Sequence, residues 1–202
     1  MLLVLGTHNR KKAIELCSLL EPLGFQLLTL ADLPNSIEVE EVGDSFAENA
    51  QRKATQQALH LKQWVLGEDS GLCVDALDGK PGIFSARFSG PGATDESNNA
   101  HLLKQLAGVP EDKRTAHYVC HMSLSDPEGN VVADCEGTCC GKILESPRGD
   151  GGFGYDPLFE LPEYHQTFGE LGPAVKSILS HRSRAMRRFV PLLLKCVQTE
   201  RA

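Results

Sequence analysis

Apolar residues at the start of the chain form short continuous runs separated by one segment with helical spacing. Residues 2–6 (LLVLG) and 25–30 (FQLLTL) have the length and composition of buried strands. Between them lies a predicted helix, residues 10–22, which Asn9 can cap. The apolar positions of this helix are Ile14, Leu16, Leu19 and Leu20. This strand–helix–strand order is typical of α/β proteins.

A second amphipathic helix is predicted to end near Lys62, with Asp44 or Ser45 as its N-cap. Its apolar positions, three or four residues apart, are Phe46, Ala50, Ala54, Ala58 and Leu61. The acidic pair Glu40-Glu41 stands ahead of this helix. It can complete an oxygen-rich site, or it can be a solvated approach to a helix start that favours acidic residues.

The remaining elements follow from turn residues between apolar runs. They are, in chain order, a short strand at 64–67, a possible strand from residue 72, a loop over 78–93, a helix capped by Thr94 that ends near Leu106, strands at 114–125 and 130–140, a glycine-rich loop at 145–156, and a helix capped by Ser180 that ends near Cys196. The turn at 126–129 predicts that the two long strands form a hairpin. No internal repeat or long linker interrupts the pattern, so we expect one α/β domain over residues 1–202.

Composition and charge narrow the range of ligands. The chain has 202 residues, enough for one domain or for two small lobes that share a sheet. Its formal net charge of −7 lacks the basic excess of proteins that bind nucleic acid polymers. A phosphate-bearing ligand is therefore expected to be a small molecule that meets a local cationic cluster or a metal. No apolar stretch is long enough for a membrane-spanning helix.

The cysteines do not form a recognisable framework. Seven are present, which is an odd number, and no C-x-x-C pair occurs. The first residues lack the basic head and the length of a signal peptide. We therefore expect reduced, structural cysteines in a cytoplasmic protein.

The stretch GTHNRKK, from Gly6 to Lys12, is the first candidate for chemistry. It lies where the first strand passes into the first helix, and a helix N-terminus attracts anions through its unpaired N–H groups and its dipole. Thr7 and Asn9 add hydrogen-bonding groups, and Lys11 and Lys12 add charge. The alternative is a capped helix with two solvated lysines.

The second candidate is the polar stretch Glu68-Asp69-Ser70-Gly71, which interrupts an apolar run. We predict that a buried strand ends just before it. Ligand sites in α/β sheets gather beyond the carboxyl ends of strands. Two adjacent carboxylates there suit a hard divalent cation, or one metal ligand beside one general base. The alternative is a turn in which Asp69 and Ser70 cap backbone groups.

Two loops and one basic segment complete the candidates. Arg87, inside a glycine- and proline-rich loop, is typical of a lid that brings a guanidinium to an anion, or of a plain surface loop. Phe153 and Tyr155 stand among glycines in GDGGFGYDPLF, which favours stacking on a nucleobase, with Asp156 orienting its polar edge. His181 and Arg182 oppose the dipole of the last helix, which favours a ligand-facing role over a solvated basic face.

These motifs together resemble the inosine triphosphate pyrophosphatases, also called Ham1-like proteins, most closely the bacterial branch. The similarity runs from THNRKK through EEVGDSFAENAQRKA, EDSGLCVDALDGKPGIFSARFSG and GGFGYDP to SHR. It implies an elongated mixed β-sheet flanked by helices, in two lobes with a central cleft. It also implies hydrolysis of ITP, dITP or XTP to the monophosphate and pyrophosphate with Mg2+, by a homodimer that clears deaminated purines from the nucleotide pool.

The resemblance also implies roles for individual residues. Asp69 matches a proton acceptor and metal ligand, and Glu41 matches a metal ligand. The residues that match substrate contacts are Thr7, His8, Asn9, Arg10, Lys11, Lys12, Lys53, Ser70, Phe153, Gly154, Tyr155, Asp156, Lys176, His181 and Arg182.

We therefore predict that Glu41, Asp69 and Glu68 hold Mg2+ on the triphosphate and that Asp69 or Glu68 orients the attacking water. The cations predicted to stabilise charge on the phosphates are Lys12, Lys53, Arg87 and Lys176. A donor directed at the purine 6-oxo group, such as Arg182 or a main-chain N–H, is expected to disfavour ATP. Two alternatives are a Maf-like nucleotide pyrophosphatase and a nucleotide-binding module without turnover.

Overall fold

The computed structural model describes residues 2–200, and the side chains of residues 2–196. The helices are α1 (Arg10–Leu20), α2 (Phe46–Leu61), α3 (Asp95–Gln105), α4 (Phe168–Leu179) and α5 (His181–Glu200). The strands are β1 (Leu2–Gly6), β2 (Gln26–Thr29), β3 (Trp64–Val74), β4 (Thr115–Ser125), β5 (Val131–Ile143), β6 (Phe159–Leu161) and β7 (Gln166–Thr167). Short 3₁₀ helices occur at Glu21–Leu23, Leu30–Asp32, Asp75–Leu77, Gly82–Arg87 and Glu111–Lys113.

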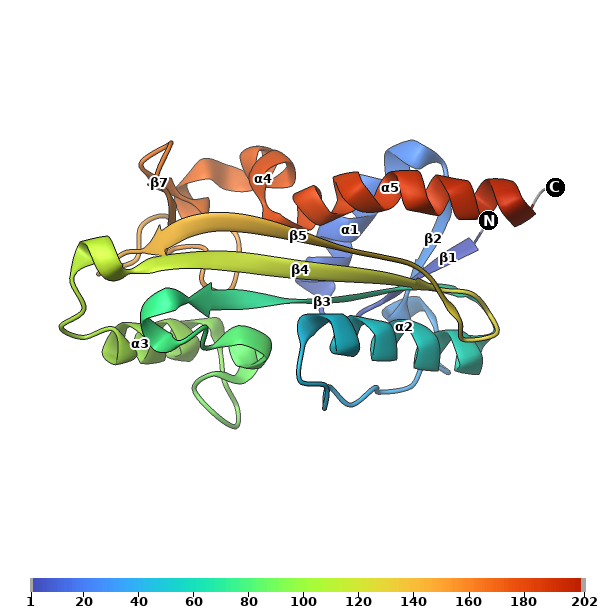
Figure 1. Ribbon diagram of the computed structural model, residues 1–202, viewed down its shortest axis with the longest axis horizontal. Helices are drawn as coiled ribbons and strands as arrows, with labels where there is room; N and C mark the ends of the chain where they lie inside the picture. The colour runs from blue at the N-terminus through green and yellow to red at the C-terminus, as the bar shows by residue number, and fades with distance from the viewer. Residues whose placement is uncertain (1, 201–202) are drawn as a thin grey trace. The chain divides into compact units, whose positions relative to one another are not determined.

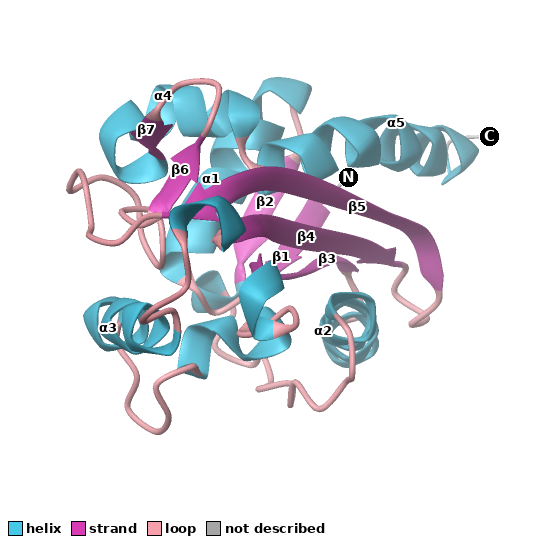
Figure 2. Ribbon diagram, turned by 60° about the vertical axis from the view of Figure 1, so that its left-hand side comes forward, coloured by secondary structure: helices cyan, strands magenta, loops and turns pink. Residues whose placement is uncertain are grey.

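The described strands form one mixed sheet of seven strands, in the order β2-β1-β3-β4-β5-β6-β7 (Figure 1, Figure 2). β1 pairs in parallel with β2 and β3, whereas β6 pairs antiparallel with β5 and β7. Helices flank the sheet. The predicted α/β class with a mixed sheet flanked by helices is therefore confirmed.

Internal contacts divide the chain into two compact units. Within the described residues, unit 1 comprises 2–69, 120–137 and 182–200, and unit 2 comprises 70–119 and 138–181. Each unit has its own hydrophobic core.

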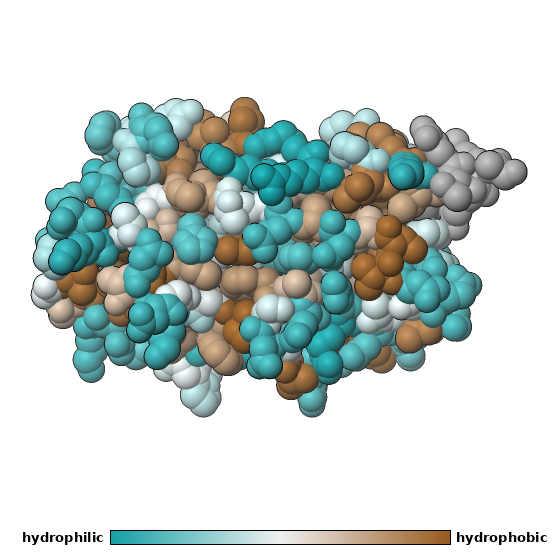
Figure 3. All heavy atoms as spheres, viewed as in Figure 1, coloured by the Kyte–Doolittle hydropathy of each residue, from teal (hydrophilic) through white to brown (hydrophobic). Residues whose placement is uncertain are grey.

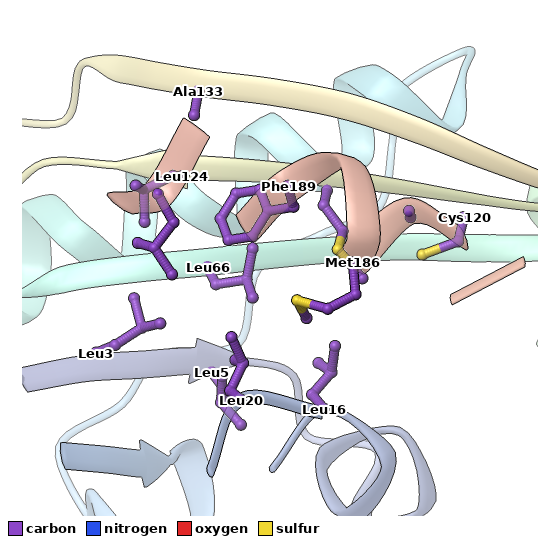
Figure 4. Packing of buried hydrophobic residues seen from close by; sticks show 13 residues of the cluster. Leu3, Leu5, Leu16, Leu20, Leu66, Cys120, Leu124, Ala133, Met186 and Phe189 are labelled. Atoms are coloured by element: carbon purple, nitrogen blue, oxygen red, sulfur yellow. The ribbon is translucent and has the colours of Figure 1, made fainter. Parts of the chain in front are cut away.

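In unit 1, neighbouring residues of β1 pack on opposite faces of the sheet. Leu3 and Leu5 belong to a core that includes side chains of α1 and Phe189 of α5 (Figure 4). Val4 belongs instead to a cluster with Ala58 of α2. Figure 1 and Figure 2 accordingly show α5 and α2 on opposite faces of these strands. Because strand side chains alternate, a continuous apolar run is what a strand covered on both faces requires.

α2 lies close against β3 at Gly67. A Cβ atom on Gly67 would lie 2.2 Å from the carbonyl oxygen of Ala50 and 2.6 Å from the amide nitrogen of Ala54. Glycine on the strand therefore lets the two backbones come together here. α2 begins as predicted, because the Ser45 hydroxyl accepts a hydrogen bond from the Glu48 amide at 3.1 Å.

The core of unit 2 combines α3, α4 and strand residues. Leu102 and Leu106 of α3 belong to the same buried cluster as Phe159 and Phe168. The rings of Phe159 and Phe168 are stacked, with centroids 5.7 Å apart. Offset aromatic contacts of this kind stabilise a core beyond the area that they bury.

The prediction that a strand ends at Gly67 is wrong. β3 runs without a break from Trp64 to Val74, so Glu68 and Asp69 lie inside it, with only 0% and 4% of their surfaces exposed. The polar stretch interrupts the apolar pattern but not the strand. Buried carboxylates are tolerated in this position because each one contacts a cation.

Most other local predictions agree with the structure. The hairpin β4–β5 and the starts of α1, α2, α3 and α5 are confirmed. Ile14, predicted on the apolar face of α1, is 61% exposed. Neither α4 nor β6 and β7 were predicted. α4 is interrupted by Gly172, whose φ is 74°, and by Pro173, and these residues hide its helical pattern.

The surface contains some large apolar side chains, which Figure 3 shows as brown patches among hydrophilic residues on one face. Scattered apolar exposure of this kind is ordinary for a folded protein. Among the described helices, none combines the length and the apolar character that crossing a membrane requires.

Candidate active site

In unit 1, two carboxylates from separate segments meet at one lysine. The Nζ atom of Lys53 lies 2.7 Å from Glu41 Oε1 and 2.8 Å from Asp69 Oδ1. Glu41 belongs to the irregular segment before α2, Lys53 to α2 and Asp69 to β3. The two carboxylate oxygens are therefore no farther apart than the sum of these distances. The structure thus brings together three residues that the sequence predicted for metal and phosphate binding.

Asn49 orients this cluster, and the sequence analysis missed it. Its side-chain amide donates to Asp69 Oδ2 at 3.3 Å, and its side-chain oxygen accepts from the Gly43 amide at 2.9 Å. Asn49 is fully buried and lies one helical turn before Lys53, so both side chains are on the same face of α2. An asparagine among the alanines of a helix was the available signal, because asparagine is a poor helix former.

Electrostatics within this cluster follow from burial and proximity. Burial raises the pKa of Asp69, against the opposing effect of the Lys53 and Lys12 cations. Burial alone would lower the pKa of Lys53, but the Asp69 and Glu41 carboxylates outweigh it and leave the pKa raised. Lys53 therefore stays protonated between the two acids.

Glu68 belongs to a second cluster in unit 1. Its carboxylate lies 3.0 Å from Arg182 Nη2 and 3.1 Å from Lys12 Nζ, and it accepts a hydrogen bond from the Cys120 thiol at 3.4 Å. Arg182 also forms an ion pair with Glu15. Successive strand residues point to opposite faces, so Glu68 points away from Asp69. This geometry places Glu68 in an ion-pair network, and its predicted share in a metal site with Asp69 stays a prediction.

Arg182, predicted as a substrate contact, is 1% exposed. Its guanidinium lies in ion pairs with Glu15 and Glu68, both of unit 1. The long arm of arginine and its several donors allow one side chain to serve two carboxylates. Its role toward substrate stays a prediction.

The predicted triphosphate segment forms the turn into α1. Asn9 caps the helix, because its side-chain oxygen accepts from the amides of Lys11 and Lys12 at 3.0 and 3.1 Å. The main-chain N–H of Asn9 in turn donates to the Thr7 hydroxyl at 3.2 Å. His8 and Arg10 are exposed, and both line a groove of about 690 Å³ beside α1 together with Thr7. The segment therefore presents a capped helix start with cationic side chains around it.

In unit 2, Asp156 organises the glycine-rich loop. Its Oδ2 atom accepts from the Phe153 amide at 2.8 Å and lies 2.6 Å from Lys176 Nζ. The Lys176 ammonium is also 4.1 Å from the centroid of the Phe153 ring, a cation–π contact. Gly152 has a φ of 77°, and a Cβ there would lie 2.1 Å from the Asp156 carboxylate. The residues predicted for the base, Phe153, Asp156 and Lys176, therefore form one cluster.

Tyr155 was predicted to offer an exposed aromatic face for stacking on a base, but the structure buries it. It is 3% exposed and belongs to the core of unit 2, and its hydroxyl donates to the Ser85 carbonyl at 2.8 Å. Burial, with a smaller contribution from Asp95, raises its pKa. The Gly154 carbonyl accepts from Asn99 at 2.9 Å. Tyr155 therefore anchors the loop, whereas Phe153 is only partly buried.

The loop with Arg87 is tied to its surroundings. The Ser85 hydroxyl accepts from the Leu72 amide at 2.9 Å, and the Asn98 side chain accepts from the Ser89 amide at 2.8 Å. Arg87 itself is exposed, with its guanidinium carbon 5.2 Å from the centroid of the Phe84 ring. The role of Arg87 in a lid that brings its guanidinium to an anion stays a prediction.

Two further residues predicted to contact substrate, His181 and Ser70, lie in unit 2. His181 is stacked on Tyr118, with centroids 4.6 Å apart and an interplanar angle of 10°. Ser70 follows Asp69 directly in β3 and is partly exposed.

Comparison with known proteins decides the family. Residues 3–192 match the Ham1 family. The chain belongs to the Ham1 family. It is 54% identical to a dITP/XTP pyrophosphatase of Rhodopirellula baltica over 98% of this chain and 95% of the relative. It is 47% identical to a dITP/XTP pyrophosphatase of Desulforamulus reducens over 96% of each chain.

Solved structures of the Ham1 family have the same fold. A HAM1 protein from Coxiella burnetii is similar with a TM-score of 0.87 and 34% identity, over 96% of this chain and 99% of that one. A nucleoside-triphosphatase, dITP/XTP pyrophosphatase, from Mycobacterium abscessus is similar with a TM-score of 0.76 and 40% sequence identity, over 96% of this chain and 100% of that one. The family predicted from the motifs is confirmed, and neither the Maf-like alternative nor a module without turnover gains support.

Proposed function

We propose that this chain hydrolyses deaminated purine nucleoside triphosphates, namely ITP, dITP and XTP, to the monophosphate and pyrophosphate. Membership of the Ham1 family and the names of its relatives support this proposal. The observation that carries it is the convergence of Glu41 and Asp69 on Lys53, because the cleavage of a triphosphate needs charge neutralisation beside a group that can activate water.

Mg2+ is the cation that this donor set fits. Among the described residues, no group of three or more His, Cys, Asp or Glu side chains can hold a metal ion. Mg2+ does not require such a cage, since it commonly binds through one or two carboxylates and substrate phosphates. Glu41 and Asp69 would hold it. When bound, Mg2+ would neutralise phosphate charge and polarise the phosphoryl oxygens.

Side chains of this protein would then accept the proton of the attacking water and bind the phosphates. Asp69 accepts the proton of the attacking water as its oxygen approaches the α-phosphorus. Lys53 and the segment from Thr7 to Lys12 bind the phosphates and stabilise the charge on departing pyrophosphate. Water adds to the α-phosphorus, the bond to the bridging oxygen breaks, and the two products are the monophosphate and pyrophosphate.

Unit 2 would bind the base. Phe153 offers a partly buried ring for stacking, and Asp156 and Lys176 offer charged groups for polar edges. ITP and XTP carry an acceptor oxygen at the purine 6-position, where ATP carries an amino donor. A protein donor directed there favours ITP and XTP, because ATP would leave that donor unmatched.

Turnover of a panel of nucleotides tests the proposal. Pyrophosphate release from ITP, dITP and XTP with Mg2+ is expected to exceed release from ATP and GTP by a large factor. Equal kcat/KM for ITP and ATP would contradict it, as would binding of ITP without release of pyrophosphate. We also propose that the enzyme is a homodimer in the cytoplasm, and analytical ultracentrifugation of the full chain tests its oligomeric state.

A further inference from the structure

Lys53 occupies the point at which Glu41 and Asp69 converge. Its ammonium lies within 2.8 Å of one oxygen of each carboxylate and donates to the Glu68 carbonyl at 3.3 Å. Its side chain is 12% exposed, and that of Asp69 is 5% exposed. The contacts of this ammonium are therefore short and largely shielded from water, where electrostatic interactions are strong.

A divalent cation held by these two carboxylates would lie close to the Lys53 ammonium, which contacts one oxygen of each. Lys53 contacts Asp69 Oδ1, and Asn49 donates a hydrogen bond to Asp69 Oδ2, so both oxygens of this carboxylate already accept a donor. An ammonium and a metal ion that share this pair of carboxylates would lie a few ångströms apart and would repel each other. Each cation on the two carboxylates is therefore expected to weaken the binding of the other.

We propose that Lys53 is a resident cation that competes with the divalent metal for Glu41 and Asp69, so that metal and nucleotide bind cooperatively. This inference rests on the proposed function. A metal alone must break both Lys53 ion pairs and leaves the ammonium without an equivalent anion. A triphosphate supplies that anion, and Lys53 then exchanges two carboxylates for phosphate oxygens.

The coupling is reciprocal by thermodynamic necessity. If a triphosphate removes the penalty for metal binding, then the metal raises the affinity for the triphosphate by the same factor. The enzyme is therefore expected to take up the metal mainly as its complex with the nucleotide. The resident ammonium also prevents repulsion between Glu41 and Asp69 when no substrate is bound.

The test is a calorimetric titration of Mn2+ into the nucleotide-free full-length protein at mildly alkaline pH. The parent protein is expected to bind weakly. Lys53→Met removes the competing charge and keeps the length of the side chain, so it is expected to bind Mn2+ about tenfold more tightly or better. Lys53→Arg keeps a cation at this position and is expected to behave like the parent. Lys104→Met removes one exposed charge from α3 in unit 2 and serves as the matched control.

Equal or weaker Mn2+ binding by Lys53→Met than by the parent would overturn the competition. Circular dichroism and thermal unfolding check that each variant is folded, and Lys53→Gln provides a second neutral variant with the same expectation. A second titration adds an ITP analogue with a non-hydrolysable α,β-bridge. The analogue is expected to tighten Mn2+ binding by a larger factor in the parent than in Lys53→Met.

These outcomes are separable from those for the proposed function. Failure of the parent to release pyrophosphate from ITP would refute the proposed function, whatever the Mn2+ titrations give. Full ITP turnover by the parent, with Mn2+ affinity unchanged in both neutral variants, would refute only the role of Lys53 as a competing cation.

Discussion

Glu68 and Asp69 are consecutive in β3, yet their carboxylates contact cations from different helices. Asp69 contacts Lys53 of α2, whereas Glu68 contacts Lys12 of α1 and Arg182 of α5. Because strand side chains alternate between faces, two adjacent acidic residues contribute to two clusters. The Asp69 cluster contains residues proposed to bind Mg2+ and phosphate, and the Glu68 cluster is a buried ion-pair network that includes Lys12.

Asp69→Asn is expected to lower kcat for ITP about a hundredfold or more, because an amide cannot accept the proton of the attacking water. The substitution keeps the size of the side chain, so the far-ultraviolet circular dichroism spectrum is expected to stay unchanged. Steady-state kinetics at saturating Mg2+ provides the measurement. A variant that retained turnover within a few-fold of the parent would remove Asp69 from this role.

Glu68→Gln is expected to reduce the free energy of unfolding by about 3–5 kcal/mol, because it leaves the buried Arg182 and the adjacent Lys12 without their shared carboxylate. Urea unfolding followed by circular dichroism measures this change. The matched control is Glu145→Gln, whose carboxylate is 74% exposed and 3.6 Å from Arg114. Removal of that exposed charge is expected to cost less than about 1 kcal/mol. Similar losses in both variants would contradict the network.

Asn49→Asp is expected to lower kcat/KM about tenfold to a hundredfold, because it replaces the donor to Asp69 with a third carboxylate. The new side chain still offers an oxygen to the Gly43 amide. Asn49→Ala removes both hydrogen bonds and is expected to lose stability as well as turnover. Comparison of kinetics and thermal unfolding for the two variants separates orientation of Asp69 from folding. Unchanged kinetics in Asn49→Asp would show that Asn49 has no part in orienting the carboxylate.

Tyr155 is expected to remain un-ionised in the folded protein well above the ordinary phenol pKa, because burial, aided by Asp95, disfavours the phenolate. The tyrosinate absorbance that develops between neutral pH and about pH 11 is therefore expected to be the same in the parent and in Tyr155→Phe. After unfolding in guanidinium chloride, Tyr155→Phe is expected to show a smaller change than the parent. A reduced signal in the folded variant would place Tyr155 in contact with solvent.

Local signals in the sequence were sufficient for most helix starts and for the first strands. Asn9, Ser45 and Thr94 each cap the helix that was predicted to follow. The continuous length of β3 was not predictable, since the partners that neutralise Glu68 and Asp69 come from α1, α2 and α5. Hydrophobic periodicity describes neighbours along the chain and does not report such distant charges.

The candidate site was partly predictable for a related reason. The family motifs identified Glu41, Lys53 and Asp69, but only the structure shows that Lys53 contacts both carboxylates. Asn49 was missed because its partners are distant in sequence. Tyr155 was interpreted as exposed because glycines surround it, yet the Ser85 carbonyl and the core of unit 2 hold it. In each case the residue type was visible in the sequence, whereas its partner depended on the fold.

The contact at Gly67 has a consequence for how this protein can vary. There, the main chain of α2 lies against the main chain of β3, so no rotamer change in the surrounding core can alter the spacing. Lys53 follows one turn after Ala50 on this helix, and Asp69 stands two residues beyond Gly67 on this strand. Gly67 therefore helps to set the distance between the Lys53 ammonium and the Asp69 carboxylate. Mutations that repack the distant core are expected to leave this distance unchanged.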